Sequence, residues 1–305
     1  MKPAEAEHLT PASTLDEMVS HPAFADFGRL LLPRDARVQD GTLPLRRIGT
    51  LLPYHSRVDD DVAVAALNRM IDDHAAGQQL FYPIYREAEQ RLDPSKRNTG
   101  LFFLRGMPGA PFAVISPGGG FAYVGAVHEG FPYAQAISAR GYNAFVLRYR
   151  AGQGGRAPTE DLAAAISFIL RHAAELDVAV DDYSLWGSSA GARMAASIGS
   201  HGVEAFGGGD VPGPAAVVMA YTGHSDIGPN EPSTFAVVGE QDRIAQPEVM
   251  ANRVAALRKA GTQVEFHHFP GVKHGFGAGV GTSGAGWIDD AVRFWEQFIS
   301  KQVHS

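Results

Sequence analysis

The sequence predicts an α/β fold built on a mostly parallel β-sheet with helices on both faces. From about residue 101 onward, short apolar segments alternate with segments of helical periodicity, and strands separated by helices form parallel sheets. The chain has 305 residues, and one α/β domain can use about 250 residues. We therefore expect a single α/β domain, residues 99–305, preceded by an N-terminal extension, residues 1–98.

The N-terminal extension shows no regular alternation of strands and helices. It contains one clear helix pattern, in which Val64, Leu67 and Met70 lie near one stripe and Gly77 can end the helix. It is also rich in apolar and aromatic residues, whereas a solvated tail would be polar. We expect it to pack on the α/β domain or on a second copy of the chain. We hypothesise that it covers the carboxyl-end face of the sheet and limits substrate size.

Six apolar segments in the α/β domain predict strands, at residues 112–115, 144–147, 183–186, 215–220, 235–238 and 264–269. Helices are predicted between these strands, over residues 131–139, after Pro158 and after Pro247. A further helix is predicted after the last strand, where apolar residues from Ile288 to Ile299 lie on one stripe. In such sheets, functional residues gather in the loops beyond the carboxyl ends of the strands. The candidate residues are therefore expected in these loops.

The composition excludes several classes of function. A net charge of −7 argues against nucleic acid or an anionic membrane surface as the main partner. Because the chain has no cysteine, it has no thiolate nucleophile and no thiolate metal ligand. No apolar run reaches the length of about 18 residues typical of a membrane span. The first 20 residues lack the apolar segment of a secretory signal, so we expect a cytoplasmic protein.

The pentapeptide Gly187-Ser188-Ser189-Ala190-Gly191 fits the pattern G-x-S-x-G. It follows an apolar strand and precedes small residues, the context in which this motif presents a serine on a strained strand-to-helix turn. Flanking glycines avoid clashes there, and the helix N-terminus favours developing negative charge. We therefore predict that Ser189 is a nucleophile. The alternative is a plain tight turn.

A serine hydroxyl needs a base that takes its proton, and two later loops supply candidates. His274 follows the last predicted strand, and Asp242 follows the strand at residues 235–238. The order serine, acid, histidine is that of α/β-hydrolases. We predict that His274 is the general base and that Asp242 orients it. Asp226 and His224, which follow the preceding strand, remain the alternative acid and base.

The segment Pro117-Gly118-Gly119-Gly120-Phe121 directly follows the predicted strand at residues 112–115. Glycines let backbone amides approach a ligand closely, and an amide aimed at an oxyanion can contribute about 3 kcal/mol. The amide of Ala190, next to the nucleophile, would be a further donor. Phosphate binding and a simple turn are the alternatives, but no G-x-G-x-x-G or Walker pattern is present.

These motifs resemble those of the α/β-hydrolase superfamily, in the acetyl-esterase and carbohydrate-esterase-like branch related to dienelactone hydrolases. The resemblance covers about residues 100–300 and also includes His274-Gly275-Phe276. It implies a serine hydrolase without a cofactor, with Gly119 and Gly120 as oxyanion donors. Hormone-sensitive-lipase-like members carry His where this chain has Pro117. Dienelactone hydrolases usually carry Cys where it has Ser189, which speaks against their reaction.

Tyr123, His128 and Glu129 follow the glycine segment. We hypothesise that Tyr123 and His128 line the substrate pocket. The alternative for the adjacent His128 and Glu129 is an ordinary solvated pair. The pair lacks the spacing of the helical zinc motif H-E-x-x-H, so no metal is expected.

The sequence thus predicts a carboxylesterase that hydrolyses short acyl esters, with acetylated sugars among the expected substrates. We expect it to bind a small ester and neither nucleic acid nor a membrane. The sequence leaves open whether it forms a homo-oligomer. A serine peptidase of the prolyl-oligopeptidase type shares the domain and the triad, but it usually carries a large propeller that about 98 residues cannot supply. A non-catalytic ligand-binding protein of this fold is the second alternative, although such proteins typically lose triad members.

Overall fold

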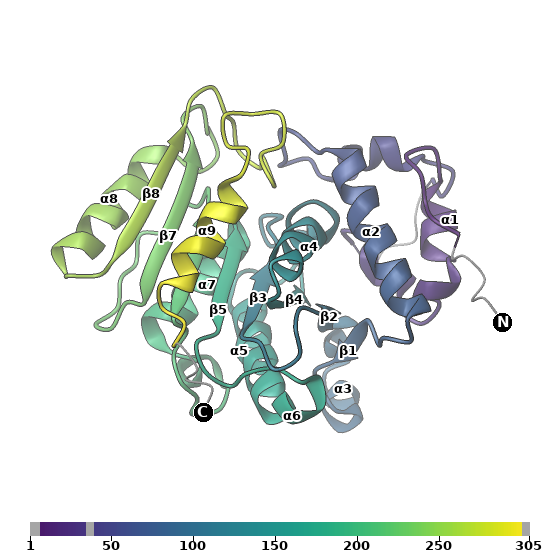
Figure 1. The fold of residues 1–305 in the computed structure, drawn as a ribbon, viewed down its shortest axis with the longest axis horizontal. Coiled ribbons are helices and arrows are strands. Elements are labelled where there is room, and N and C mark those ends of the chain that lie inside the picture. Colours follow the sequence, from purple (N-terminus) through teal and green to yellow (C-terminus); the bar gives the residue numbers. More distant parts are fainter. Residues whose placement is uncertain (1–6, 35–39, 301–305) are drawn as a thin grey trace.

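The computed structural model describes residues 7–34 and 40–300 of the chain (Figure 1). Within these residues an eight-stranded sheet forms the centre, in the order β1-β2-β4-β3-β5-β6-β7-β8. The strands are β1 (Phe81–Pro83), β2 (Gly100–Leu104), β3 (Phe112–Ser116), β4 (Asn143–Arg148), β5 (Ser184–Ser188), β6 (Ala216–Ala220), β7 (Ser233–Gly239) and β8 (Val264–Phe269). The strands from β4 through β8 in this order pair in parallel, while β1 and β2 are antiparallel to their neighbours. This mostly parallel sheet confirms the predicted fold class.

The six predicted strands correspond to β3 through β8, with ends that differ by up to two residues. The sequence pattern did not predict β1 and β2. β1 has three residues and includes Pro83, so its pairing depends on tertiary contacts. Phe81 opposes Phe102 across the β1–β2 pair and also stacks on Phe27, with ring centroids 5.6 Å apart. Aromatic packing therefore holds this antiparallel edge of the sheet.

Helices cover the two faces of the sheet. They are α1 (Leu15–Val19), α2 (Asp60–Ala75), α3 (Glu87–Leu92), α4 (Phe131–Ala139), α5 (Arg156–Arg171), α6 (Ala173–Leu176), α7 (Ala190–His201), α8 (Pro247–Lys259) and α9 (Trp287–Glu296). Short 3₁₀ segments span Pro22–Phe24, Gly28–Leu31, Leu45–Leu51, Pro94–Asn98 and Glu204–Phe206, and a π-helical turn spans Ala126–Gly130. α4 packs with α9, and α5 packs with α7 on the opposite side of the sheet (Figure 1). The predicted helix at residues 131–139 is α4, whereas α9 ends before Ile299.

The N-terminal residues share the hydrophobic core of the sheet. Leu67 and Met70, in the stripe predicted for α2, are fully buried, and α2 packs against α4. A single cluster of buried side chains joins Leu15, Phe24 and Leu67 to the strands. None of the helices in residues 7–34 and 40–300 combines the length and the apolar character that crossing a membrane requires.

Candidate active site

Ser189 lies at a strained turn between β5 and α7. Its backbone has φ 51° and ψ −114°, a region that residues with a side chain rarely adopt. A Cβ atom on Gly187 would come within 2.3 Å of the carbonyl oxygen of Gly191, and one on Gly191 within 1.8 Å of the oxygen of Ser116. Both flanking positions therefore require glycine. The turn holds the serine at the carboxyl end of β5.

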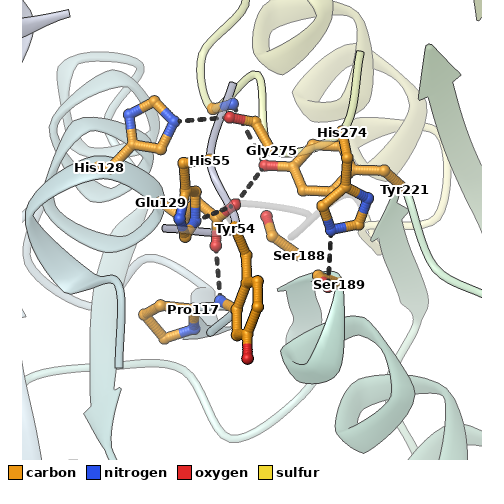
Figure 2. Close-up of polar contacts among 12 residues, drawn as sticks. Tyr54, His55, Pro117, His128, Glu129, Ser188, Ser189, Tyr221, His274 and Gly275 are labelled. Carbon is orange, nitrogen blue, oxygen red and sulfur yellow. Dashed lines mark hydrogen bonds and ion pairs between the residues drawn. The ribbon is translucent and has the colours of Figure 1, made fainter. Parts of the chain in front are cut away.

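The structure brings the side chains of Ser189, His274 and Asp242 together. Nε2 of His274 lies 3.0 Å from Oγ of Ser189, as Figure 2 shows, and its Nδ1 lies 2.7 Å from Oδ2 of Asp242. The other oxygen of Asp242 accepts hydrogen bonds from the amides of Ile244 and Ala245, both at 2.8 Å. His274 and Asp242 are buried. With its Nδ1 proton held by the carboxylate, the imidazole can accept the serine proton at Nε2.

The alternative acid and base lie apart from this group. Asp226 pairs with His201 at 2.6 Å, and its side chain is 60% exposed. His224 is buried, and its Nε2 has no hydrogen-bond partner among the residues that the structure describes. Burial, together with the charge of Arg253, lowers the pKa of His224 to about 4. Neither side chain bonds to Ser189 or His274 within the described part of the chain.

The glycine segment after β3 passes directly beside the candidate nucleophile. A Cβ atom on Gly118 would lie 3.1 Å from Cβ of Ser189. Gly119 and Gly120 have φ of 137° and 61°, a backbone region that favours glycine. In the described residues, the amides of Gly119, Gly120 and Ala190 donate to no other protein group. These amides are therefore free to bind an oxygen atom of a ligand next to Ser189.

Part of the N-terminal region forms a wall of the site. The ring of Tyr54 stacks on the ring of Tyr123. A Cβ atom on Gly120 would lie 2.9 Å from Cε2 of Tyr54. The amide of Ser56 donates a hydrogen bond to the carbonyl oxygen of His274 at 3.1 Å. A cavity of about 330 Å³ lies beside His274, between residues 53–56 and the loops after β7 and β8. The N-terminal region therefore limits the space next to the candidate base.

Tyr123 and His128, which the sequence placed in the substrate pocket, are both buried. The hydroxyl of Tyr123 accepts a hydrogen bond from the amide of Tyr54 and lies 3.0 Å from Nδ1 of His55. Nε2 of His128 lies 3.1 Å from the carbonyl oxygen of Gly275. Both side chains support segments that form the site, and contact with a substrate stays a prediction.

The pair His128 and Glu129 lies on the π-helical turn, and both side chains are buried. The alternative of a solvated pair is therefore wrong. Burial and the nearby His55 lower the pKa of His128 to about 4. Burial alone would raise the pKa of Glu129, but the charge and hydrogen bond of His55 outweigh that effect and lower it to about 2. At neutral pH we expect a neutral His128 and an ionised Glu129.

Glu129 makes contacts that the sequence pattern did not reveal. Its carboxylate lies 2.9 Å from Nε2 of His55, and it accepts hydrogen bonds from the hydroxyl of Tyr221 and the amide of Gly118, both at 2.6 Å. His55 had no local signal in the sequence, while Tyr221 directly follows a strand. Within residues 7–34 and 40–300, no group of three or more His, Asp or Glu side chains is arranged to hold a metal ion.

Two family models match adjoining parts of the chain. The BD-FAE family matches residues 108–210, and the prolyl oligopeptidase family matches residues 214–302. Ser189 lies in the first match, and Asp242 and His274 lie in the second. No curated protein matches the chain.

Several solved structures have a similar fold. MGS-M1, an alpha/beta hydrolase enzyme from a Medee basin deep-sea metagenome library, is 25% identical with a TM-score of 0.57, covering 66% of this chain and 92% of that one. An acetyl ester-xyloside bifunctional hydrolase from Caldicellulosiruptor lactoaceticus is 22% identical with a TM-score of 0.61, covering 72% and 97%. A thermophilic esterase from Thermogutta terrifontis with propionate bound is 19% identical with a TM-score of 0.60, covering 73% and 96%. These similarities show a shared fold.

Proposed function

The chain belongs to the α/β-hydrolase superfamily, and on this premise we propose that it is a serine carboxylesterase that hydrolyses short acyl esters. One observation carries the proposal. His274 bridges Ser189 and Asp242 through its two ring nitrogens, at 3.0 Å and 2.7 Å. This is the arrangement by which a histidine activates a serine hydroxyl while a carboxylate fixes its tautomer.

In the proposed reaction, Oγ of Ser189 attacks the ester carbonyl carbon while Nε2 of His274 takes the hydroxyl proton. The carbonyl oxygen becomes an oxyanion, which the amides of Gly119, Gly120 and Ala190 stabilise. The tetrahedral intermediate then collapses, and His274 gives its proton to the leaving alcohol. Water attacks the acyl-enzyme with His274 again as the base, which releases the carboxylic acid and restores Ser189.

The proposed substrates are small, and acetylated sugars are among them. One neighbour is named an acetyl ester-xyloside hydrolase, and another contains propionate, which supports short acyl groups. The cavity of about 330 Å³ beside His274 has room for a small group, although Ser189 is not among the residues that line it. Its wall includes Tyr54, which is 43% exposed and offers an aromatic face to a sugar ring or an aryl alcohol.

A serine peptidase is the second candidate, because residues 214–302 match the prolyl oligopeptidase family. Hydrolysis of p-nitrophenyl acetate, p-nitrophenyl octanoate and a prolyl p-nitroanilide separates the candidates. The esterase proposal expects the acetate to be hydrolysed fastest and the anilide hardly at all. Faster cleavage of the anilide would favour the peptidase. No turnover of any of the three would favour a non-catalytic ligand-binding protein.

A further inference from the structure

A buried hydrogen-bond network lies behind the proposed active site (Figure 2). It is centred on Glu129 and includes the side chains of His55, Tyr221, Tyr133 and Ser188, and we call these the Glu129 network. Glu129, Tyr133, Tyr221 and Ser188 are at most 1% exposed, and the side chain of His55 is 3% exposed. Burying polar groups of this kind lowers the stability of a fold unless every one of them forms hydrogen bonds.

The charge on Glu129 fixes the direction of the hydrogen bonds around it. An ionised carboxylate only accepts, so Tyr221, His55 and the amide of Gly118 must all donate to it. The oxygen of Tyr221 is then left to accept from the amide of Gly277 at 3.2 Å and from the hydroxyl of Tyr133 at 3.1 Å.

The same direction continues toward the candidate nucleophile. Because the hydroxyl of Tyr133 donates to Tyr221, its oxygen accepts from the hydroxyl of Ser188, which lies 3.0 Å away. Ser188 precedes Ser189 in the sequence and ends β5. A continuous series of donors therefore runs from the last residue of this strand to the carboxylate.

A second branch reaches the N-terminal region. His55 donates from Nε2 to Glu129, and its Nδ1 lies 3.0 Å from the hydroxyl of Tyr123. The oxygen of Tyr123 in turn accepts from the amide of Tyr54 at 3.2 Å. Tyr54 lies against Gly120, one of the candidate oxyanion donors.

The network contacts the glycine segment, the residue before Ser189 and the ring of His274, but it does not contact the reacting atoms. One oxygen of Glu129 holds the amide of Gly118, a residue on which an added Cβ atom would lie 3.1 Å from Cβ of Ser189. The other oxygen holds Tyr221, whose ring lies edge-on to the ring of His274 with centroids 5.1 Å apart. Oxyanion stabilisation depends on donors that are already in place when charge develops.

We propose that Glu129 is a positioning residue, which fixes the glycine segment with one carboxylate oxygen and the Tyr221–His274 contact with the other. This inference rests on the proposed function. Misplaced donors and a misplaced base weaken interactions made only in the transition state, so removing the charge should lower kcat and leave KM nearly unchanged.

The chain contains a closely matched control. The side chain of Glu231 is also buried, and it pairs with Arg253 at 2.9 Å. It also accepts one backbone amide, from Gly228, and one hydroxyl, from Ser200, both at 2.6 Å. A Glu231→Gln variant therefore disturbs the same kind of buried carboxylate, and in the described residues Glu231 forms no hydrogen bond or ion pair with Ser189 or His274.

The experiment compares Glu129→Gln with Glu231→Gln in the full chain. We expect Glu129→Gln to lower kcat for p-nitrophenyl acetate by about tenfold or more, with KM within about threefold. Glu231→Gln should lower the melting temperature but keep kcat within about twofold. A folded Glu129→Gln protein with wild-type kcat would overturn the proposal, as would an equal loss of kcat in Glu231→Gln. If Glu129→Gln does not fold, Tyr221→Phe, which removes one hydroxyl, decides the question by the same criteria.

Covalent labelling separates this inference from the proposed function. A fluorophosphonate reacts with an activated serine whatever the natural substrate is, so its rate reports on Ser189, His274 and the oxyanion donors. We expect about tenfold slower labelling of Glu129→Gln than of Glu231→Gln. Equal rates would overturn the positioning role. If the wild type labels but hydrolyses no ester, the esterase proposal fails while the labelling comparison still tests Glu129.

Discussion

The backbone amide of Ser56 donates a hydrogen bond to the carbonyl oxygen of His274, with the two atoms 3.1 Å apart. Nearly the whole α/β domain separates these residues in the sequence. The contact places the N-terminal region directly against the loop that carries the candidate base. The shape of the proposed active site therefore depends on both parts of the chain.

The first prediction concerns the nucleophile and the base. We expect Ser189→Ala and His274→Ala each to lower kcat for p-nitrophenyl acetate by at least about 10³-fold, because neither can form the acyl-enzyme efficiently. The double variant should be little worse than either single one, since these residues act as a unit. Circular dichroism checks that the variants are folded. Near-wild-type turnover by Ser189→Ala would refute the assignment.

The acid is tested separately. Asp242→Asn keeps the shape of the side chain but favours the wrong tautomer of His274, so we expect turnover to fall by about 10³–10⁴-fold. Asp226→Asn is the matched control, because Asp226 pairs with His201 at the surface. Its turnover should stay within a few-fold of wild type. The reverse outcome would show that the acid follows β6 instead of β7.

A third prediction concerns Tyr54 as a wall of the site. The ring is 43% exposed and lies against Gly120, so Tyr54→Ala opens space beside the candidate oxyanion donors. We expect the ratio of kcat/KM for octanoate to that for acetate esters to rise by about 3–10-fold. Tyr54→Phe keeps the ring and should leave the ratio unchanged. An unchanged ratio in Tyr54→Ala would remove support for a size limit set by the N-terminal region.

The fourth prediction follows from the buried His128. Its pKa is lowered from 6.5 to about 4 in the folded protein, so between these values the unfolded chain binds the proton more readily. Stability is therefore full above about pH 6.5 and decreases as the pH falls toward 4. When the pH is lowered from 7 to 5, we expect the protonation of His128 in the unfolded chain to reduce the free energy of unfolding by about 2 kcal/mol.

Urea denaturation at the two pH values measures this effect in the wild type and in His128→Asn, which does not titrate. His224 has the same lowered pKa, so His224→Asn must be measured alongside to separate the two contributions. An identical pH dependence in the wild type and His128→Asn would contradict the prediction.

The sequence predicted the parts of the molecule that depend on local patterns. The strands β3 to β8 are apolar segments bounded by turn residues, and the geometry around Ser189 follows from two glycines that no other residue can replace without a clash. The places of Asp242 and His274 follow from the rule that parallel strands present their carboxyl ends at one edge. Local sequence is sufficient for these features because each is defined within a few residues.

The parts that could not be predicted depend on long-range contacts. β1 forms because Phe81 packs against two aromatic rings from other parts of the chain. Phe27 lies far from it in the sequence, and Phe102 lies in β2. The sequence cannot show whether an adjacent His-Glu pair is solvated or buried, and here a π-helical turn directs both side chains inward. His55 acquires its role only when the fold brings it to within 2.9 Å of Glu129.

The bond between Ser56 and His274 also sets an order of events during protein synthesis. A ribosome adds about 5–20 residues per second, so roughly 10–40 s pass between the appearance of Ser56 and that of His274. Throughout that time the segment that contains Ser56 lacks the carbonyl group that it will bind. The wall that this segment forms beside the candidate base is therefore complete only after the loop that follows β8 has been made.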